Sequence, residues 1–180
     1  MKISDGRRAE TLDRAAPGAT LRLLFWLRVV AVAAQTSLEA IVHYGLGITL
    51  PLAPLTITIA ALALWNVGSF VRLRRGREAG HAAVALDLVA DVAALTSLLY
   101  FTGGPTNPFV SLYLVPISLA AISLRRAAAW LVGGICGACY TLLWLRHVPL
   151  PSVHGRFGGD FDLHLAGMWV NFLVAAVLIL

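Results

Sequence analysis

Charged side chains are scarce in this sequence: they make up 13% of the 180 residues, whereas soluble globular domains carry about 25%. Cysteine is scarcer still, and its two copies, Cys136 and Cys139, lie within an apolar run and offer no disulfide framework. Because 59% of the residues are hydrophobic, the chain lacks the polar side chains that cover the surface of a soluble fold. A typical cytosolic enzyme, a disordered tail and a disulfide-stapled secreted domain are therefore excluded. The composition predicts an integral membrane protein.

Long apolar runs are what the sequence has instead. A helix needs roughly 20 apolar residues to cross about 30 Å of hydrocarbon. Six segments meet or nearly meet this length: 23–44, 50–73, 82–101, 108–124, 127–145 and 163–180. The first run is too long for the apolar core of a signal peptide and follows a polar stretch, so we expect it to be retained. The predicted fold is all-α: a polytopic membrane protein with a bundle of six transmembrane helices.

The basic residues are divided unequally between the connecting segments. If the N-terminus lies in the cytoplasm, every lysine and arginine except Arg146 and Arg156 falls in a cytoplasmic stretch, Arg28 and Arg72 included. Lysine and arginine accumulate on the cytoplasmic side of membrane proteins, so we expect the N-terminus inside. The net charge of +5 then reflects topology and contact with anionic membrane lipid, and no nucleic-acid partner is expected.

No internal repeat or low-complexity linker divides the chain. We therefore expect a cytoplasmic N-terminal tail, residues 1–22, followed by one membrane domain, residues 23–180. The sixth apolar run reaches Leu180 with no polar flank and is slightly too short to clear the bilayer. We expect this helix to continue in a longer protein and to emerge in the cytoplasm.

The connection between the third and fourth runs holds the most informative string, Thr102-Gly103-Gly104-Pro105-Thr106-Asn107-Pro108-Phe109. The two glycines favour the end of a helix. Asn107 suits a helix N-cap, and Pro108 suits the first helical position. One interpretation is a purely structural hairpin.

The other interpretation is a ligand site at the outer membrane boundary. Backbone N–H groups near Gly103 and Gly104, the amide of Asn107 and the ring of Phe109 would lie together there. A lipid-soluble quinone needs hydrogen-bond donors for its carbonyl oxygens and an apolar surface for its ring. Tyr113 follows Phe109 by one α-helical turn, and we expect it on the same face.

These residues resemble a known family. The segment 103–109 fits the Gly-Gly-x-x-Asn-Pro-Phe heptapeptide of the RegB/PrrB family of redox-sensing histidine kinases. In that family the heptapeptide lies in the outer loop between the third and fourth of six membrane helices and is associated with ubiquinone binding. Weaker likeness extends to 27–35, 50–52, 87–91 and 147–150, so the resemblance covers most of the chain.

The resemblance implies a sensor domain in the bacterial inner membrane that binds ubiquinone. Its implied quinone-binding residues are Gly103, Gly104, Asn107, Pro108 and Phe109. It also implies a homodimer, and a histidine kinase in which a cytoplasmic half binds ATP and phosphorylates a response regulator. That half, with its phosphoacceptor histidine and reactive cysteine, does not match any of these 180 residues, so we expect no catalytic residue here.

Three acidic residues fall within the apolar runs. Asp87 and Asp91 are four residues apart and share one face of the third helix, with Asp91 near mid-bilayer. They are either a proton-accepting or switching pair, or a buried hydrogen-bonded helix contact. Glu39 lies near the depth of the Gly-Gly string and either accepts from a quinol hydroxyl or pairs with a neighbouring helix. Trp169, near the start of the sixth run, is a further candidate of lower rank.

The remaining cysteines and histidines carry little signal. Cys136 and Cys139 have dithiol spacing, but the small residues around them favour a helix-packing face. The last connection contains histidines and aspartates that match no metal-ligand spacing, so we expect no metal site.

The sequence thus predicts a membrane sensor that distinguishes oxidised from reduced quinone and signals through its sixth helix. Oxidised quinone only accepts hydrogen bonds, whereas the reduced form also donates them. A ligand shifts a two-state helix bundle only through such a difference in affinity. The rival hypothesis is a small proton-coupled transporter or membrane enzyme that uses Asp87, Asp91 and Glu39.

Overall fold

A computed structural model gives the fold of the chain. It describes residues 3–45, 50–75 and 80–148, together with 168–169, 172–173, 175–177 and 179–180 of the last run; side chains are described from residue 18 onward, except at 42. Every regular element within these ranges is helical, which confirms the predicted all-α fold.

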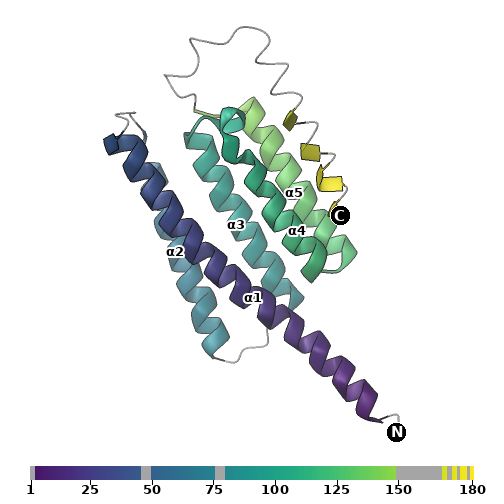
Figure 1. Cartoon of the computed structure of the whole chain (residues 1–180). Coiled ribbons are helices and arrows are strands. Elements are labelled where there is room, and N and C mark those ends of the chain that lie inside the picture. The colour runs from purple at the N-terminus through teal and green to yellow at the C-terminus, as the bar shows by residue number, and fades with distance from the viewer. Residues whose placement is uncertain are drawn as a thin grey trace.

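The helices follow the apolar runs closely (Figure 1). In chain order they are α1 (Ile3–Ala40), the π-helical turn η1 (Ile41–Gly45), α2 (Leu52–Arg74), α3 (His81–Phe101), the 3₁₀ turns η2 (Gly104–Thr106) and η3 (Pro108–Tyr113), α4 (Leu114–Ser123) and α5 (Arg126–Leu145). α1 begins well before the predicted span, so the segment expected as a tail is helical from Ile3 onward. The fourth predicted helix differs more, because its first six residues are a 3₁₀ helix.

Neighbouring helices pack into one bundle. α1 lies beside α2, α2 beside α3, and α5 beside both α3 and α4 (Figure 1). The main core lies between α3, α4, α5 and the sixth run. Its members include Val84, Leu88, Val92, Leu99, Val110, Tyr113, Ile117, Val132, Tyr140, Leu143, Phe172 and Ala176. A smaller cluster of Leu55, Ile59 and Leu98 joins α2 to α3.

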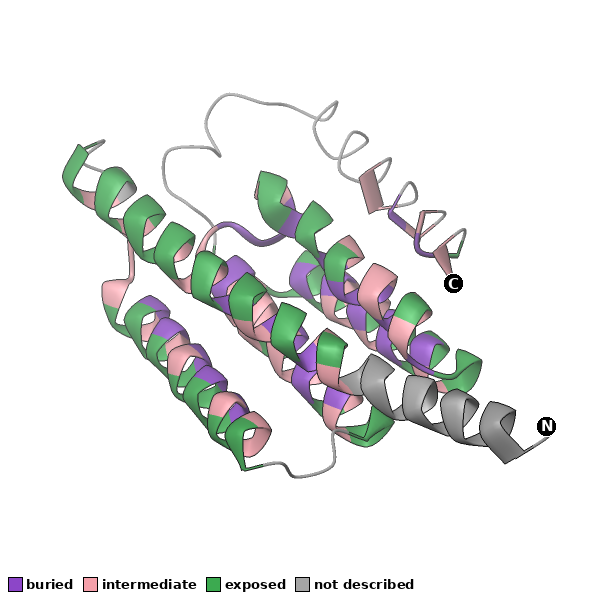
Figure 2. Cartoon of the chain, turned by 60° about the horizontal axis from the view of Figure 1, so that its bottom comes forward, coloured by how far each residue is buried: buried purple, intermediate pink, exposed green. Residues whose placement is uncertain are grey.

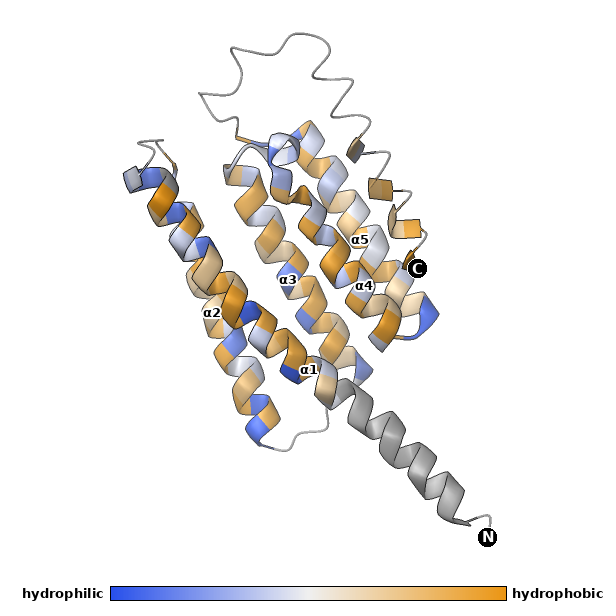
Figure 3. Ribbon diagram, in the orientation of Figure 1, coloured by the Kyte–Doolittle hydropathy of each residue, from blue (hydrophilic) through white to orange (hydrophobic). Residues whose placement is uncertain are grey.

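Hydrophobic residues also occupy the outward, exposed faces of these helices (Figures 2 and 3). Ile57, Leu64, Ile122 and Leu145 are each more than two-thirds exposed. A helix that is hydrophobic all round is stable at the protein surface only where that surface meets lipid. Among the residues that the structure describes, four helical segments are long and apolar enough to cross a membrane, namely Gly18–Gly45, Leu52–Arg74, His81–Phe101 and Arg126–Leu145, and the shorter segment Pro108–Ser123 is also apolar.

Candidate functional site

Two glycines with left-handed backbones close the connection after α3, residues 102–109, which we call the Gly-Gly turn. Gly103 has φ of 100° and Gly104 has φ of 58°, a region that side chains rarely adopt. A Cβ atom at Gly104 would also lie 2.5 Å from Cβ of His147, just beyond α5. The predicted glycine stop is therefore confirmed, and at Gly104 it has a steric cause as well as a conformational one.

Asn107 fixes the second half of the turn. Its Oδ1 accepts from the backbone N–H of Phe109 at 2.9 Å, which confirms the predicted N-cap with Pro108 in the first position. Its Nδ2 donates to the backbone oxygen of Thr102 at 3.1 Å and to the Oγ1 of Thr102 at 2.8 Å. Both the oxygen and the nitrogen of the Asn107 amide are thus engaged inside the turn, and these bonds hold the turn in shape.

Phe109 and Tyr113 do not share a face, contrary to our expectation. Phe109 is 44% exposed, whereas Tyr113 is completely buried. The reason is the 3₁₀ geometry of η3, which has about three residues per turn, so that Leu112 and not Tyr113 lies below Phe109. The exposed apolar face of the turn therefore consists of Phe109 and Leu112, while Tyr113 points into the bundle.

Inside the bundle, Tyr113 belongs to an aromatic cluster with Tyr140 of α5 and Phe172 of the sixth run. The ring centroid of Tyr113 lies 6.4 Å from that of Tyr140 and 6.2 Å from that of Phe172, and the Tyr140–Phe172 distance is 5.1 Å. The hydroxyl of Tyr113 shares a hydrogen bond of 2.7 Å with Oγ1 of Thr96. The cluster joins η3, α5 and the sixth run directly behind the Gly-Gly turn.

Asp91 is paired with Arg28, which is only 3% exposed despite its charge. Arg28 donates through Nε and Nη2 to the two carboxylate oxygens of Asp91, the second at 3.0 Å, which is a bidentate pair. It also donates to the backbone oxygen of Asp87 at 2.8 Å. We placed Arg28 with the cytoplasmic basic residues, and that assignment was wrong because its side chain enters the bundle between α1 and α3.

Asp87 is held by residues of α2. Arg72 Nη2 donates to its Oδ1 at 2.9 Å, Trp65 Nε1 donates to the same atom at 2.8 Å, and Ser69 Oγ donates at 3.1 Å. We call Arg28, Arg72, Asp87 and Asp91 the ion-pair network, in which Arg28 and Asp87 are buried and the side chains of Asp91 and Arg72 are 22% and 39% exposed. Its formal charges cancel, as burial of charge requires. Of the two interpretations of the aspartates, the geometry favours the structural helix contact.

The sequence carries a signal for this network that a count of basic residues overlooks. Leu21, Leu24 and Arg28 follow the spacing of one α-helical face, and both leucines are buried. An arginine on a buried face needs a carboxylate partner. Asp87 and Asp91 are the acidic residues within the next two spans, so the pairing was accessible from periodicity.

Glu39 forms no hydrogen bond with the Gly-Gly turn or with the ion-pair network among the described residues. Its Oε1 is buried and has no hydrogen-bond partner within the described part of the chain, and the same holds for Oε1 of Gln35 and Nδ1 of His43. The spacing of four residues puts all three on one face of the far half of α1 and its π-helical extension. No hydrogen bond joins Glu39 to the Gly-Gly turn among the described residues.

Trp169 attaches the sixth run to α5. Its Nε1 donates to Oγ1 of Thr141 at 3.2 Å, and its ring centroid lies 6.0 Å from that of Trp144. Cys136 is buried and Cys139 half-buried, both as free thiols. In the ranges that the structure covers, no three histidine, cysteine or acidic side chains gather as metal ligands. His154, Asp160, Asp162 and His164 lie outside the described residues.

Long helices that are apolar on both buried and lipid-facing sides define a polytopic α-helical membrane domain. A family model for the PilS-like transmembrane domain, with six membrane helices, matches residues 15–178. Because this match covers nearly the whole chain, the protein belongs to that family.

Among curated proteins, the chain is similar to sensor histidine kinase RegB of Cereibacter sphaeroides, with 27% identity over 154 residues. The similarity covers 86% of this chain and 33% of the relative, so the chain spans about a third of that protein's length. The RegB-like resemblance predicted from the heptapeptide is therefore confirmed. No solved structure matches the chain.

Proposed function

We propose that this chain is the membrane sensor domain of a redox-responsive histidine kinase and that it senses the ubiquinone pool through the region of the Gly-Gly turn. The observation that carries the proposal is the turn itself. Two positive-φ glycines and a fully engaged asparagine present Phe109 on an exposed apolar face, in a chain similar to RegB.

Within this proposal the five motif residues have different tasks. Gly103, Gly104 and Asn107 are positioning residues, since the glycines are buried and the amide is engaged inside the turn. Pro108 and Phe109 are exposed and supply the surface that meets an aromatic ligand. Loss of Asn107 therefore acts on quinone binding indirectly, through the shape of the turn.

The contacts of the sixth run behind the Gly-Gly turn suggest how the signal is transmitted. The sixth run packs on α5 through Trp169 and joins the aromatic cluster through Phe172. A quinone that favours one arrangement of this cluster shifts the position of the sixth helix, which we propose leads into the cytoplasm. There an ATP-binding kinase half would phosphorylate a response regulator. We further propose a homodimer in the bacterial inner membrane, with the N-terminus inside.

The rival function, a proton-coupled transporter or membrane enzyme, is less well supported. It requires Asp87 and Asp91 to exchange protons, whereas both carboxylates accept hydrogen bonds from arginine. Of these three acidic residues, only Glu39 keeps a buried carboxylate oxygen without a partner in the described ranges.

The test compares Phe109→Ala with Leu112→Ala in the whole protein, reconstituted in liposomes. The two side chains are a matched pair, because they share one face of η3 and are 44% and 42% exposed. Autophosphorylation is measured over a titration of ubiquinone and of ubiquinol. We expect Phe109→Ala to weaken the quinone response about tenfold, since an aromatic pair contributes about 0.5–1.5 kcal/mol.

Leu112→Ala is expected to retain the response of the native protein. If the two variants respond alike, Phe109 does not contact the quinone. If the native protein shows no difference between ubiquinone and ubiquinol, the proposed function is wrong.

A further inference from the structure

We infer that the ligand's ring binds in a pocket behind the Gly-Gly turn, between η3, α5 and the sixth run, and that the hydroxyl of Tyr140 donates to one of its carbonyl oxygens. This inference rests on the proposed function and deepens it. It adds an inner wall to the proposed site, behind the lipid-facing surface of Pro108 and Phe109, and it makes the sixth run part of the site.

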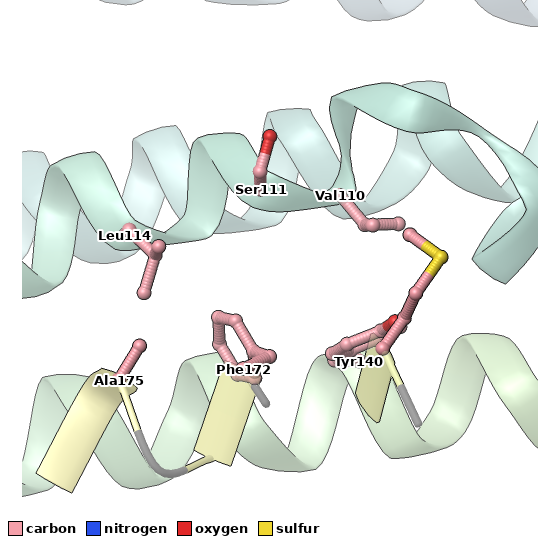
Figure 4. A pocket seen from close by; sticks show the side chains of 7 residues that line it. Val110, Ser111, Leu114, Tyr140, Phe172 and Ala175 are labelled. Carbon is pink, nitrogen blue, oxygen red and sulfur yellow. The ribbon is translucent and has the colours of Figure 1, made fainter. Parts of the chain in front are cut away.

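The pocket is small and lies directly beside the motif. Its volume is about 120 Å³. Its walls come from three parts of the chain: Val110, Ser111 and Leu114; Tyr140; and Met168, Phe172 and Ala175 (Figure 4). Val110 and Ser111 immediately follow Phe109. A cavity of about 150 Å³ binds benzene, so this pocket is slightly smaller than that cavity and must widen to admit a substituted quinone ring.

The pocket has the composition of a site for an apolar ring. Apart from Ser111 and Tyr140, the side chains that line it are aliphatic, thioether or phenyl groups. Ser111 Oγ already donates to the backbone oxygen of Pro108 at 3.2 Å. An apolar lining with few polar groups is typical of small-molecule sites.

The hydroxyl of Tyr140 is the group whose missing partner indicates a ligand. Its side chain is 1% exposed, and its hydroxyl is buried without a hydrogen-bond partner among the residues described. Buried hydroxyls are nearly always paired, because an unpaired one loses its bonds to water with no return. Tyr113, in the same aromatic cluster, follows that rule through its bond to Thr96.

The Tyr140 hydroxyl is closed off from the pocket, so a ligand must displace a neighbouring side chain to reach it. A quinone carbonyl would then accept from this hydroxyl, and the phenyl ring of Phe172 would pack against the ligand's ring. Met168 lines the same pocket, and its flexible thioether chain can adjust to an entering ligand. Three of the lining residues belong to the sixth run, so occupation of the pocket acts directly on that helix. The bound quinone would thus contact the sixth helix, which we propose carries the signal, without an intervening element.

The experiment uses two pairs of variants of the whole protein in lipid nanodiscs, titrated with decylubiquinone by quenching of tryptophan fluorescence. The first pair is Tyr140→Phe and Tyr113→Phe. We expect Tyr140→Phe to bind about tenfold more weakly, because one hydrogen bond is lost, and to keep or raise the Tm without ligand, because an unpaired hydroxyl is removed. Tyr113→Phe should show the reverse pattern, a lower Tm with affinity within about twofold, because its hydroxyl bonds Thr96.

The second pair is Ala175→Phe, which fills the pocket, and Val177→Phe, which adds the same ring on the 58% exposed, outward side of the sixth run. Only Ala175→Phe should abolish binding. If Tyr140→Phe and Ala175→Phe both bind as the native protein does, the pocket assignment is overturned while the proposed function stands. If the native protein does not bind decylubiquinone, the proposed function itself fails.

Discussion

At the scale of single residues, the side chain of Arg28 on α1 forms hydrogen bonds with residues of both α2 and α3. From α1 it contacts Asp91 and the backbone of Asp87 on α3, and its Nη1 lies 3.4 Å from Oγ of Ser69 on α2. Removal of one member of a buried ion pair leaves the partner charged and unpaired, which destabilises a protein by about 3–5 kcal/mol. The guanidinium group of Arg28 thus joins the first three helices.

We therefore predict that Arg28→Gln lowers the free energy of unfolding by about 3–5 kcal/mol. Reversible unfolding in mixed micelles, followed by circular dichroism, measures this change. Arg22→Gln, six positions earlier on the same helix and exposed, is the matched control and should change stability by less than about 1 kcal/mol. Equal effects of the two substitutions would show that Arg28 is not buried in the protein.

The residue scale is also where sequence reasoning was least successful. Arg28 was misplaced because a count of basic residues ignores which helix face each one occupies. Tyr113 was misplaced because its spacing from Phe109 was interpreted with α-helical pitch, whereas η3 is a 3₁₀ helix. The engagement of the Asn107 amide with Thr102 depends on side-chain rotamers that the sequence alone does not determine.

At the scale of elements, the lengths of apolar runs predicted α2, α3 and α5 to within two residues at each end. The Gly-Gly turn was also predictable, because helix-stop glycines and an asparagine–proline start act locally. The contact of Gly104 with His147 was not, since it joins residues more than 40 positions apart. Local signals are readable from sequence, whereas a contact between distant segments is readable only where a residue demands a particular partner, as the buried Arg28 demands a carboxylate.

The turn yields a prediction on stability. Gly104→Ala should lower the free energy of unfolding by about 1–3 kcal/mol, because its backbone has φ of 58° and its new Cβ would meet His147. Gly134→Ala, within α5, is the control: nothing lies within 4 Å of its Cβ position, and alanine there should stabilise the helix slightly. The same unfolding measurement serves both, and similar values would contradict the geometry of the turn.

At the scale of the whole molecule, the orientation in the membrane decides where a ligand meets the protein. α5 has 20 residues and is flanked by two exposed arginines, Arg125 at its start and Arg146 at its end. Its length of about 30 Å matches the hydrocarbon core, so the two arginines lie at opposite surfaces. Arg146 is on the same end of the bundle as the Gly-Gly turn, since His147 contacts Gly104.

We predict that Arg146→Cys reacts with a membrane-impermeant maleimide in intact spheroplasts, whereas Arg125→Cys reacts only after permeabilisation. Cys136 and Cys139 are first replaced by alanine, so that each variant has a single thiol. Asymmetry of basic residues sets this orientation. The opposite labelling pattern would place the Gly-Gly turn on the cytoplasmic side and remove the basis of the proposed site.

The ion-pair network has a consequence for biogenesis. A charged residue near the middle of a single span raises the free energy of membrane insertion by about 2.5–3.5 kcal/mol. The first span carries Arg28, and its carboxylate partners arrive only with the third span, some sixty residues later in synthesis. The nascent first helix therefore lacks the counter-ions of Arg28 until α3 has left the ribosome, so this charge is compensated only once helices one to three are all present.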